Sequence, residues 1–196
     1  MSAVTPASLP DDRAVEALGL LARAHEASGQ WRAALEAYDA LSRYAVVPQD
    51  MVRFQAAKAY LALDEPASAI AQLEAVDLGS LRASRRAEIL EELAGARAVQ
   101  EDYAGAAAEY GRILEFAESA DYRAQVLARQ ASALRTANRI DKAIPLWRAL
   151  ANDYVSTASA VQGVDALDAL GLGGEISDLT RGVAFYGASR YAEALA

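Results

Sequence analysis

The chain has 196 residues, a formal net charge of −8, no cysteine and one histidine. An acidic chain does not attract nucleic acid through its overall field, and the lack of cysteine removes disulfides and thiolate metal sites. A single histidine excludes most zinc and haem designs, so we expect no metal and no cofactor. No apolar run approaches the roughly 20 residues of a membrane span. Alanine, leucine, glutamate and arginine are abundant, which predicts an all-α fold.

The N-terminal part of the chain contains a lead-in and a first helical hairpin. Residues 1–12 are small and polar with two prolines, so we expect a flexible lead, with Asp11 or Asp12 capping the first helix. Apolar residues then recur at the i, i+3, i+4, i+7 spacing of a helix. The first hairpin is expected over about residues 15–45, with its turn at Gly29.

Three further hairpins follow, so that four repeats fill residues 13–154. They are expected at about residues 51–76, 84–114 and 122–154, with turns at Asp64, Glu101 and Asn138. Pro145 falls inside the last helix of this set. Because proline lacks an N–H and crowds the preceding turn, we expect a kink or a late helix start there.

One alanine recurs early in the second helix of each hairpin and gives the period of the repeat. These alanines are Ala34, Ala69, Ala106 and Ala143, at intervals of 35, 37 and 37 residues. The next match, Ala194, comes 51 residues later. The excess predicts an extra helix over residues 158–170 and a glycine-rich loop, which together fill residues 155–176. A partial fifth hairpin is then expected over residues 177–196.

A second small residue recurs midway along each first helix, where two backbones must approach closely. These residues are Ala22, Ala57, Ala94, Ala131 and Gly182. With the alanine series, they make the chain resemble the tetratricopeptide repeat (TPR) family. The resemblance implies a right-handed α-solenoid with a concave inner surface, and a non-catalytic scaffold that binds a protein or a peptide in this concave groove.

The order of elements carries a second, looser resemblance. The repeats, the segment IPLWRALANDYVSTASAVQGVDAL at 144–167 and the segment LTRGVAFYGASRYAEAL at 179–195 are similar to the N-terminal helical region of bacterial soluble lytic murein transglycosylases. This alternative implies a cell-envelope protein that reaches cell-wall glycan through a missing catalytic domain. Because the last helix is only about one turn long, we expect the chain to be a piece of a longer protein. The catalytic motif of that family has no counterpart here, so no catalytic residue is assigned.

Helix phase places a set of first-helix side chains away from the partner helix, where they would line the groove. The candidate binding residues are Arg23, Glu26, Phe54, Lys58, Glu91, Gln125, Ser132 and Arg135. TPR domains that clamp a carboxylate use basic and amide side chains at such positions. Phe54 and Glu91 occupy two of them, which argues against a carboxylate clamp. His25 is expected to be a half-buried packing residue, because neither a base partner nor further metal ligands are visible.

Charge is unevenly distributed along the third and fourth hairpins. Residues 88–121 hold nine acids and two arginines, whereas residues 122–150 hold six basic residues and one acid. Either the fourth hairpin offers a basic ligand surface, or the two segments pair with each other, which we favour. We also expect self-association through the C-terminal end, where Tyr191, Ala194 and Leu195 would be apolar and uncovered.

Overall fold

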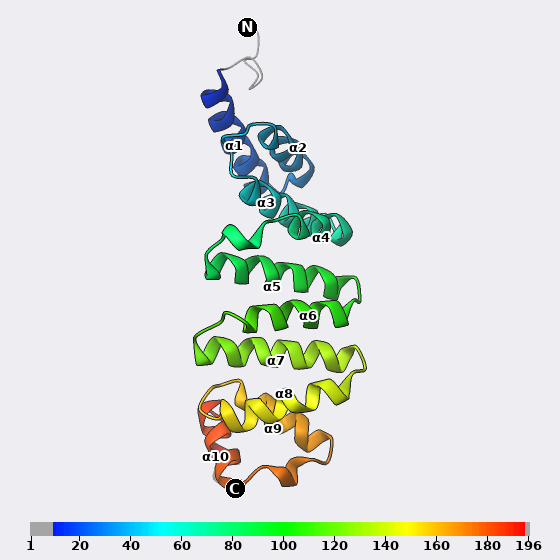
Figure 1. The fold of residues 1–196 in the computed structure, drawn as a ribbon, viewed down its shortest axis with the longest axis vertical. Coiled ribbons are helices and arrows are strands. Elements are labelled where there is room, and N and C mark those ends of the chain that lie inside the picture. The colour runs from blue at the N-terminus through cyan, green and yellow to red at the C-terminus, as the bar shows by residue number, and fades with distance from the viewer. Residues whose placement is uncertain (1–9, 195–196) are drawn as a thin grey trace. The chain divides into compact units, whose positions relative to one another are not determined.

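The computed structural model describes residues 10–194, with only the backbone of residues 191 and 192 (Figure 1). The expected flexible lead therefore lies almost wholly outside the described residues. Helices and short 3-10 turns are the only regular structure in the described part, so the all-α fold class is confirmed. None of the described helices has the length and apolar character needed to cross a membrane. The chain divides into two compact units, Met1–Arg82 and Ala83–Ala196.

The first unit contains two helical hairpins. Their helices are α1 (Asp11–Ala27), α2 (Trp31–Ser42), α3 (Gln49–Ala62) and α4 (Pro66–Glu74), followed by a 3-10 turn at Leu78–Ser80. Pro10 is the N-cap of α1, without a capping side chain, so the expectation that Asp11 or Asp12 caps this helix is wrong. Both aspartates lie in the first turn instead, where a carboxylate interacts favourably with the positive end of the helix dipole.

The second unit contains two longer hairpins and a less regular C-terminal part. Its helices are α5 (Ala83–Val99), α6 (Tyr103–Leu114), α7 (Ala120–Thr136), α8 (Ile140–Asp153), α9 (Ala160–Ala169), α10 (Asp178–Gly187) and α11 (Tyr191–Ala194). Figure 1 shows α5 to α8 as successive, roughly antiparallel rods. Helix α8 begins at Ile140 and continues through Pro145, so the expected late helix start is wrong. Proline at this place, within the second turn, removes one intrahelical N–H donor.

The same turn closes every hairpin in the described chain. One residue in each turn has a positive φ, between 57° and 72°: Gly29, Asp64, Glu101, Asn138 and Ser189. The residue after it donates its backbone N–H to the carbonyl five positions earlier, as in Gln30→His25 at 2.8 Å and Asp102→Arg97 at 2.9 Å. This is the Schellman motif, which satisfies carbonyls left free at a helix end. The positive-φ residues repeat at the same intervals as the alanine series.

The two small-residue series lie in the core, as the repeat pattern predicts. Ala22, Ala57, Ala94 and Ala131 are fully buried at 0% exposure, and the members of the other series from Ala34 to Ala143 are exposed by 1% or less. Gly182 and Ala194 are half-buried. Small side chains at these places let the paired helices pack closely, while larger residues such as Tyr38 and Trp147 fill the remaining volume.

Helix α9 packs against α8 through a glycine. A Cβ added at Gly163 would lie 2.5 Å from the carbonyl oxygen of Trp147 and 2.9 Å from Cβ of Leu150. Only glycine fits at this distance, because real Cβ atoms do not approach within 3.0 Å of such neighbours. The two helix backbones are therefore in direct contact.

Ion pairs hold the glycine-rich loop after α9. Gly171 has a φ of 72° and ends α9 with another Schellman bond, from Leu172 N–H to the Leu167 carbonyl at 2.8 Å. Arg148 on α8 donates two hydrogen bonds to Glu175, at 2.7 and 2.9 Å. Arg181 on α10 pairs with Asp168 and also bonds the Gly173 carbonyl at 3.2 Å. The loop is thus anchored to three helices.

Candidate functional site

The first unit has a groove of about 310 Å³ on the face of α1 and α3 that helix phase assigned to ligands. Arg23, one of the predicted residues, lines it together with Glu16, Gly19, Leu20 and Met51. Leu20 and Met51 are 60% and 45% exposed, so the groove offers apolar area that a ligand could cover. The groove can therefore receive an apolar side chain of a ligand between the carboxylate of Glu16 and the guanidinium of Arg23.

The other predicted residues of this unit lie elsewhere. Glu26 is half-buried beside Tyr38; burial raises the pKa of the Tyr38 hydroxyl above its ordinary value, and a hydrogen bond with Glu26 raises it further. Phe54 is only 2% exposed, so its placement as a groove residue is corrected: the ring belongs to the core. Lys58, which is exposed, places its ammonium 5.7 Å from the centre of that ring. Phe54 lies at the edge of the predicted face. Its ring turns into the core because burial there removes more apolar area from water than a position in the groove would.

The second unit has a larger groove, of about 570 Å³, where the start of α5, the connection after α6 and the start of α7 meet. Its wall is made of small and aromatic residues with three carboxylates and no basic residue. The lining residues are Ala83, Ser84, Ala87, Glu88, Glu91, Phe116, Ala117, Glu118, Ser119 and Tyr122. Glu91 is the only residue of the predicted set among them.

Glu91 joins the two walls of this groove. Its Oε1 accepts a hydrogen bond from the Tyr122 hydroxyl at 2.9 Å and lies 3.1 Å from Nη1 of Arg129. Burial and the bond to Glu91 raise the pKa of Tyr122 to about 12. The tyrosine thus stays protonated at neutral pH and acts as a donor, not as a base. The contact fixes α5 against α7 and gives the groove a defined width.

The remaining predicted residues, Gln125, Ser132 and Arg135, are exposed on α7 and do not line this groove. The charges of the two hairpins pair in part, through Arg129 and Glu91. Arg123 instead donates to the carbonyls of Leu114 and Ala117, at 2.8 and 2.7 Å. Three other basic residues of the fourth hairpin make no ion pair within the described part of the chain: Arg135, Arg139 and Lys142.

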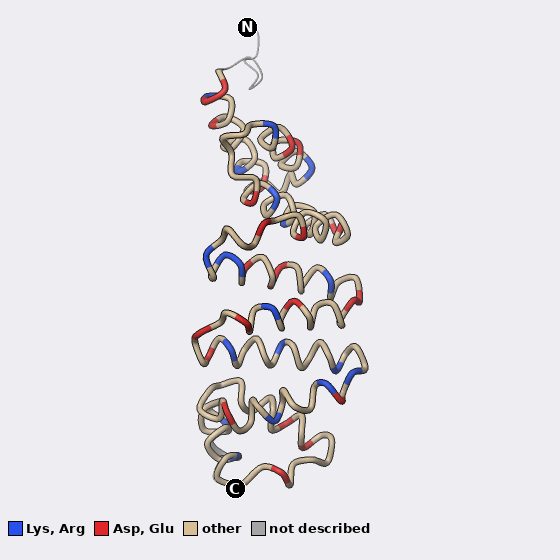
Figure 2. The backbone as a smooth tube through the Cα atoms, in the orientation of Figure 1, with Lys and Arg blue, Asp and Glu red and all other residues tan. Residues whose placement is uncertain are grey.

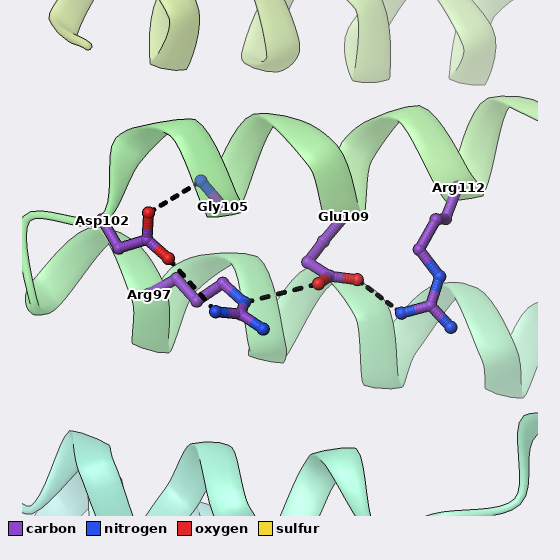
Figure 3. Close-up of polar contacts among 5 residues, drawn as sticks. All are labelled: Arg97, Asp102, Gly105, Glu109 and Arg112. Carbon is purple, nitrogen blue, oxygen red and sulfur yellow. Dashed lines mark hydrogen bonds and ion pairs between the residues drawn. The ribbon is translucent and has the colours of Figure 1, made fainter.

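A charged network crosses the α5–α6 hairpin (Figure 3). Asp102 caps α6 by accepting from Gly105 N–H at 2.8 Å, and it also pairs with Arg97 at 3.1 Å. Glu109, 6% exposed, lies between Arg97 at 3.3 Å and Arg112 at 2.6 Å. Each oxygen of its carboxylate therefore faces a guanidinium. These contacts fix the hairpin and present no open position to a substrate.

Other chemical candidates make structural contacts or lie on open surface, and His25 also lines a further groove of the first unit, of about 610 Å³, between α1 and α2. His25 is half-buried and its Nδ1 lies 2.7 Å from Gln30 Oε1, as expected for a packing residue. No three His, Asp or Glu side chains among the described residues are grouped to hold a metal ion. Ala194 is packed against the core of the second unit, which corrects its placement on an uncovered face. The side chains of Tyr191 and Leu195 lie outside the described residues. Leu179 and Val183, exposed by 78% and 38%, share one face of α10.

Solved structures share the architecture, although no protein-family model and no curated protein matches the sequence. The nearly identical TPR-like repeats of a candidate kinesin light chain from Podosopora anserina superpose with a TM-score of 0.55 at 17% identity, over 92% of this chain and 90% of that one. A second crystal structure of such repeats gives 0.53 at 19% identity, over 99% and 92%. The chain therefore has the TPR-like helical-repeat fold. The resemblance to murein transglycosylases finds no support in these matches.

Proposed function

We propose that the chain is a non-catalytic scaffold that binds a segment of a partner protein. The observation that carries this proposal is the groove of the second unit, which is lined by small and aromatic residues and bordered by carboxylates. Such a mixture suits a side chain of a partner, because apolar walls supply affinity and a few polar groups set orientation. The TPR-like fold supports a scaffold of this kind.

The groove of the first unit supports the same role. Exposed Leu20 and Met51 offer apolar area that a partner would cover, and Arg23 and Glu16 offer hydrogen bonds at its border. Association through two grooves on one chain would raise the overall affinity beyond that of either groove, provided that one partner can reach both. The proposed contact residues remain those assigned from helix phase, without Phe54. Two of them line the grooves, Arg23 and Glu91. The others lie outside the grooves: Glu26, Lys58, Gln125, Ser132 and Arg135.

The proposal is tested by selecting peptides from a random phage-displayed library against the purified chain. Ser84→Trp fills the second groove from its exposed wall, and Gln100→Trp adds the same bulk beyond the other end of α5. We expect a class of peptides that loses at least about tenfold in affinity with Ser84→Trp and is unchanged by Gln100→Trp. No enrichment, or enrichment insensitive to Ser84→Trp, would contradict the proposed groove.

The absence of catalysis is tested separately. Peptidoglycan, the substrate of the alternative class of protein, is incubated with the purified chain, and soluble fragments are measured by chromatography. We expect no release above the buffer control, because neither of the two grooves shows, among the described residues, a serine hydroxyl hydrogen-bonded to a base, as an activated nucleophile requires. Release that increases with protein concentration would overturn the non-catalytic proposal.

A further inference from the structure

We propose that the second-unit groove receives an arginine side chain of the partner protein. This inference rests on the proposed function, since it names the chemistry of the segment that the groove binds. It follows from three properties of the lining: small apolar walls, aromatic rings and an excess of acid.

The walls fit the aliphatic stem of a long side chain. Ala83, Ala87 and Ala117 leave space because their side chains end at Cβ, and Phe116 and Tyr122 add flat apolar surface. Arginine buries its methylene stem along such surfaces while its head group reaches polar partners. A short or acidic side chain would leave either the volume or the carboxylates without a partner.

The carboxylates give the lining of the groove a negative charge. Glu88 already pairs with Arg85 at 2.6 Å and Glu91 with Arg129 at 3.1 Å, so both are partly neutralised. Glu118 is exposed and makes no ion pair within the described residues, so it is the carboxylate of the lining that remains open to a partner's cation. Arg86, which stacks on Phe116, is not part of the lining, so the excess of acid belongs to the lining side chains alone. Figure 2 shows acidic residues, and no basic ones, in the connection between α6 and α7. A cation entering the groove therefore gains an interaction that an apolar ligand cannot make.

The aromatic lining favours a guanidinium over an ammonium. The chain's own Arg86 places its guanidinium carbon 4.3 Å from the centre of the Phe116 ring, which shows that the ring suits a stacked guanidinium but that one of its faces is taken. A partner's arginine would have to stack on the other face. Tyr122, held by Glu91, presents a second ring on the opposite helix. A planar guanidinium can stack on an aromatic face and bond both oxygens of a carboxylate, whereas a lysine ammonium does neither as well.

The test uses the wall alanines as reporters. The methyl groups of Ala83, Ala87 and Ala117 are followed by NMR in alanine-methyl-labelled protein. Two peptides are titrated to about 10 mM: acetyl-Gly-Ala-Arg-Ala-Gly-amide, and the same peptide with citrulline, which keeps the shape of arginine without its charge. We expect the three methyl signals to shift with the arginine peptide, and the citrulline peptide to bind at least about tenfold more weakly.

Two charge variants distinguish local contact from the general acidic field. Glu118→Gln removes the free carboxylate of the groove, and we expect affinity for the arginine peptide to fall about three- to tenfold. Glu115→Gln changes the net charge equally, but Glu115 is exposed and outside the lining, so affinity should be unchanged. Equal losses in both variants would overturn the proposal.

The outcomes separate this inference from the proposed function. Equal binding of the arginine and citrulline peptides, or no shift with either, overturns the arginine inference. If the phage selection still yields peptides that lose affinity with Ser84→Trp, the proposed scaffold function stands without the arginine inference. If the selection yields none, the proposed function fails as well.

Discussion

The hairpin α5–α6 and the helix pair α8–α9 are both close helix packings, but they are built by different means. In the hairpin, the helices are joined by a tight positive-φ turn at Glu101, separated by alanine side chains and crossed by the Arg97–Glu109 network. In the α8–α9 pair, a longer connection joins the helices and the backbones touch at Gly163.

Because of this difference, the two helix pairs should respond differently to a substitution that adds volume at the contact. Where the helices meet through alanine, a methyl group lies between the two backbones, so side chains set the distance between the helices. At Gly163 the neighbour is the Trp147 carbonyl oxygen, which cannot move without moving α8. The regular hairpin should therefore absorb small changes that the added helix cannot, because packed interiors relax little around fixed backbone.

Gly163→Ala should give the largest effect. The added methyl would lie 2.5 Å from the Trp147 carbonyl oxygen, so α9 must shift away from α8. We expect a loss of about 2–3 kcal/mol in the free energy of unfolding, even after the gain of about 1 kcal/mol for replacing glycine in a helix. Urea unfolding followed by Trp147 fluorescence, in a Trp31→Phe background, measures this change.

Gly95→Ala on α5 is the matched control. No heavy atom lies within 4 Å of the added Cβ, so only helix propensity acts, and stability should rise by about 0.5–1 kcal/mol. If both substitutions stabilise the second unit, the close contact at Gly163 is wrong.

Ala106→Leu tests the hairpin by overpacking. Ala106 is 1% exposed, and a larger side chain should cost about 1–3 kcal/mol in the free energy of unfolding. Ala108, which is exposed on the same helix, is the control. Ala108→Leu should change the urea midpoint little. An unchanged midpoint for Ala106→Leu would mean that the repeat register is misassigned.

Glu109→Gln tests the charged network of the same hairpin. The neutral amide keeps the shape but leaves half-buried Arg97 with a weaker partner, which should cost about 1–2 kcal/mol of stability. Glu88→Gln, which loses the more exposed pair with Arg85, should cost less than about 0.5 kcal/mol. Equal urea midpoints for the two variants would show that the network stabilises the hairpin no more than the exposed pair does.

Glu101→Gly should stabilise the turn of the hairpin. Glu101 has a φ of 61°, where a side chain is strained and glycine is not. We expect a gain of about 0.5–1 kcal/mol, reduced by the greater freedom of glycine in the unfolded chain. The reverse change, Gly29→Ala at a φ of 72°, should destabilise the first unit, with Trp31 fluorescence as the readout.

Leu179→Glu should have the smallest effect on stability, below about 0.5 kcal/mol, because the side chain is 78% exposed. It tests the proposed self-association instead. We expect light scattering to show a mass that rises with concentration for the original chain and stays constant for the variant. A constant monomer mass for both chains would remove self-association through this end.

The sequence predicted the repeats better than the grooves, for a physical reason. Hairpins follow from local periodicity and from small residues at fixed intervals, so their turns at Gly29, Asp64 and Glu101 could be placed correctly. The second groove depends on Phe116, which lies in a connection that helix phase does not describe. Phe54 was misplaced because phase gives the direction of a Cα–Cβ bond, whereas the burial of a long ring depends on its neighbours.

The recurring turn also makes each hairpin observable by amide hydrogen exchange. The N–H that closes it belongs to one known residue per hairpin: Gln30, Glu65, Asp102, Arg139 or Arg190. Exchange at such an amide requires local opening of that turn, so its rate reports the opening free energy of one hairpin. Because each repeat mainly contacts its neighbours, these five protons would show whether the hairpins open independently or in cooperative groups.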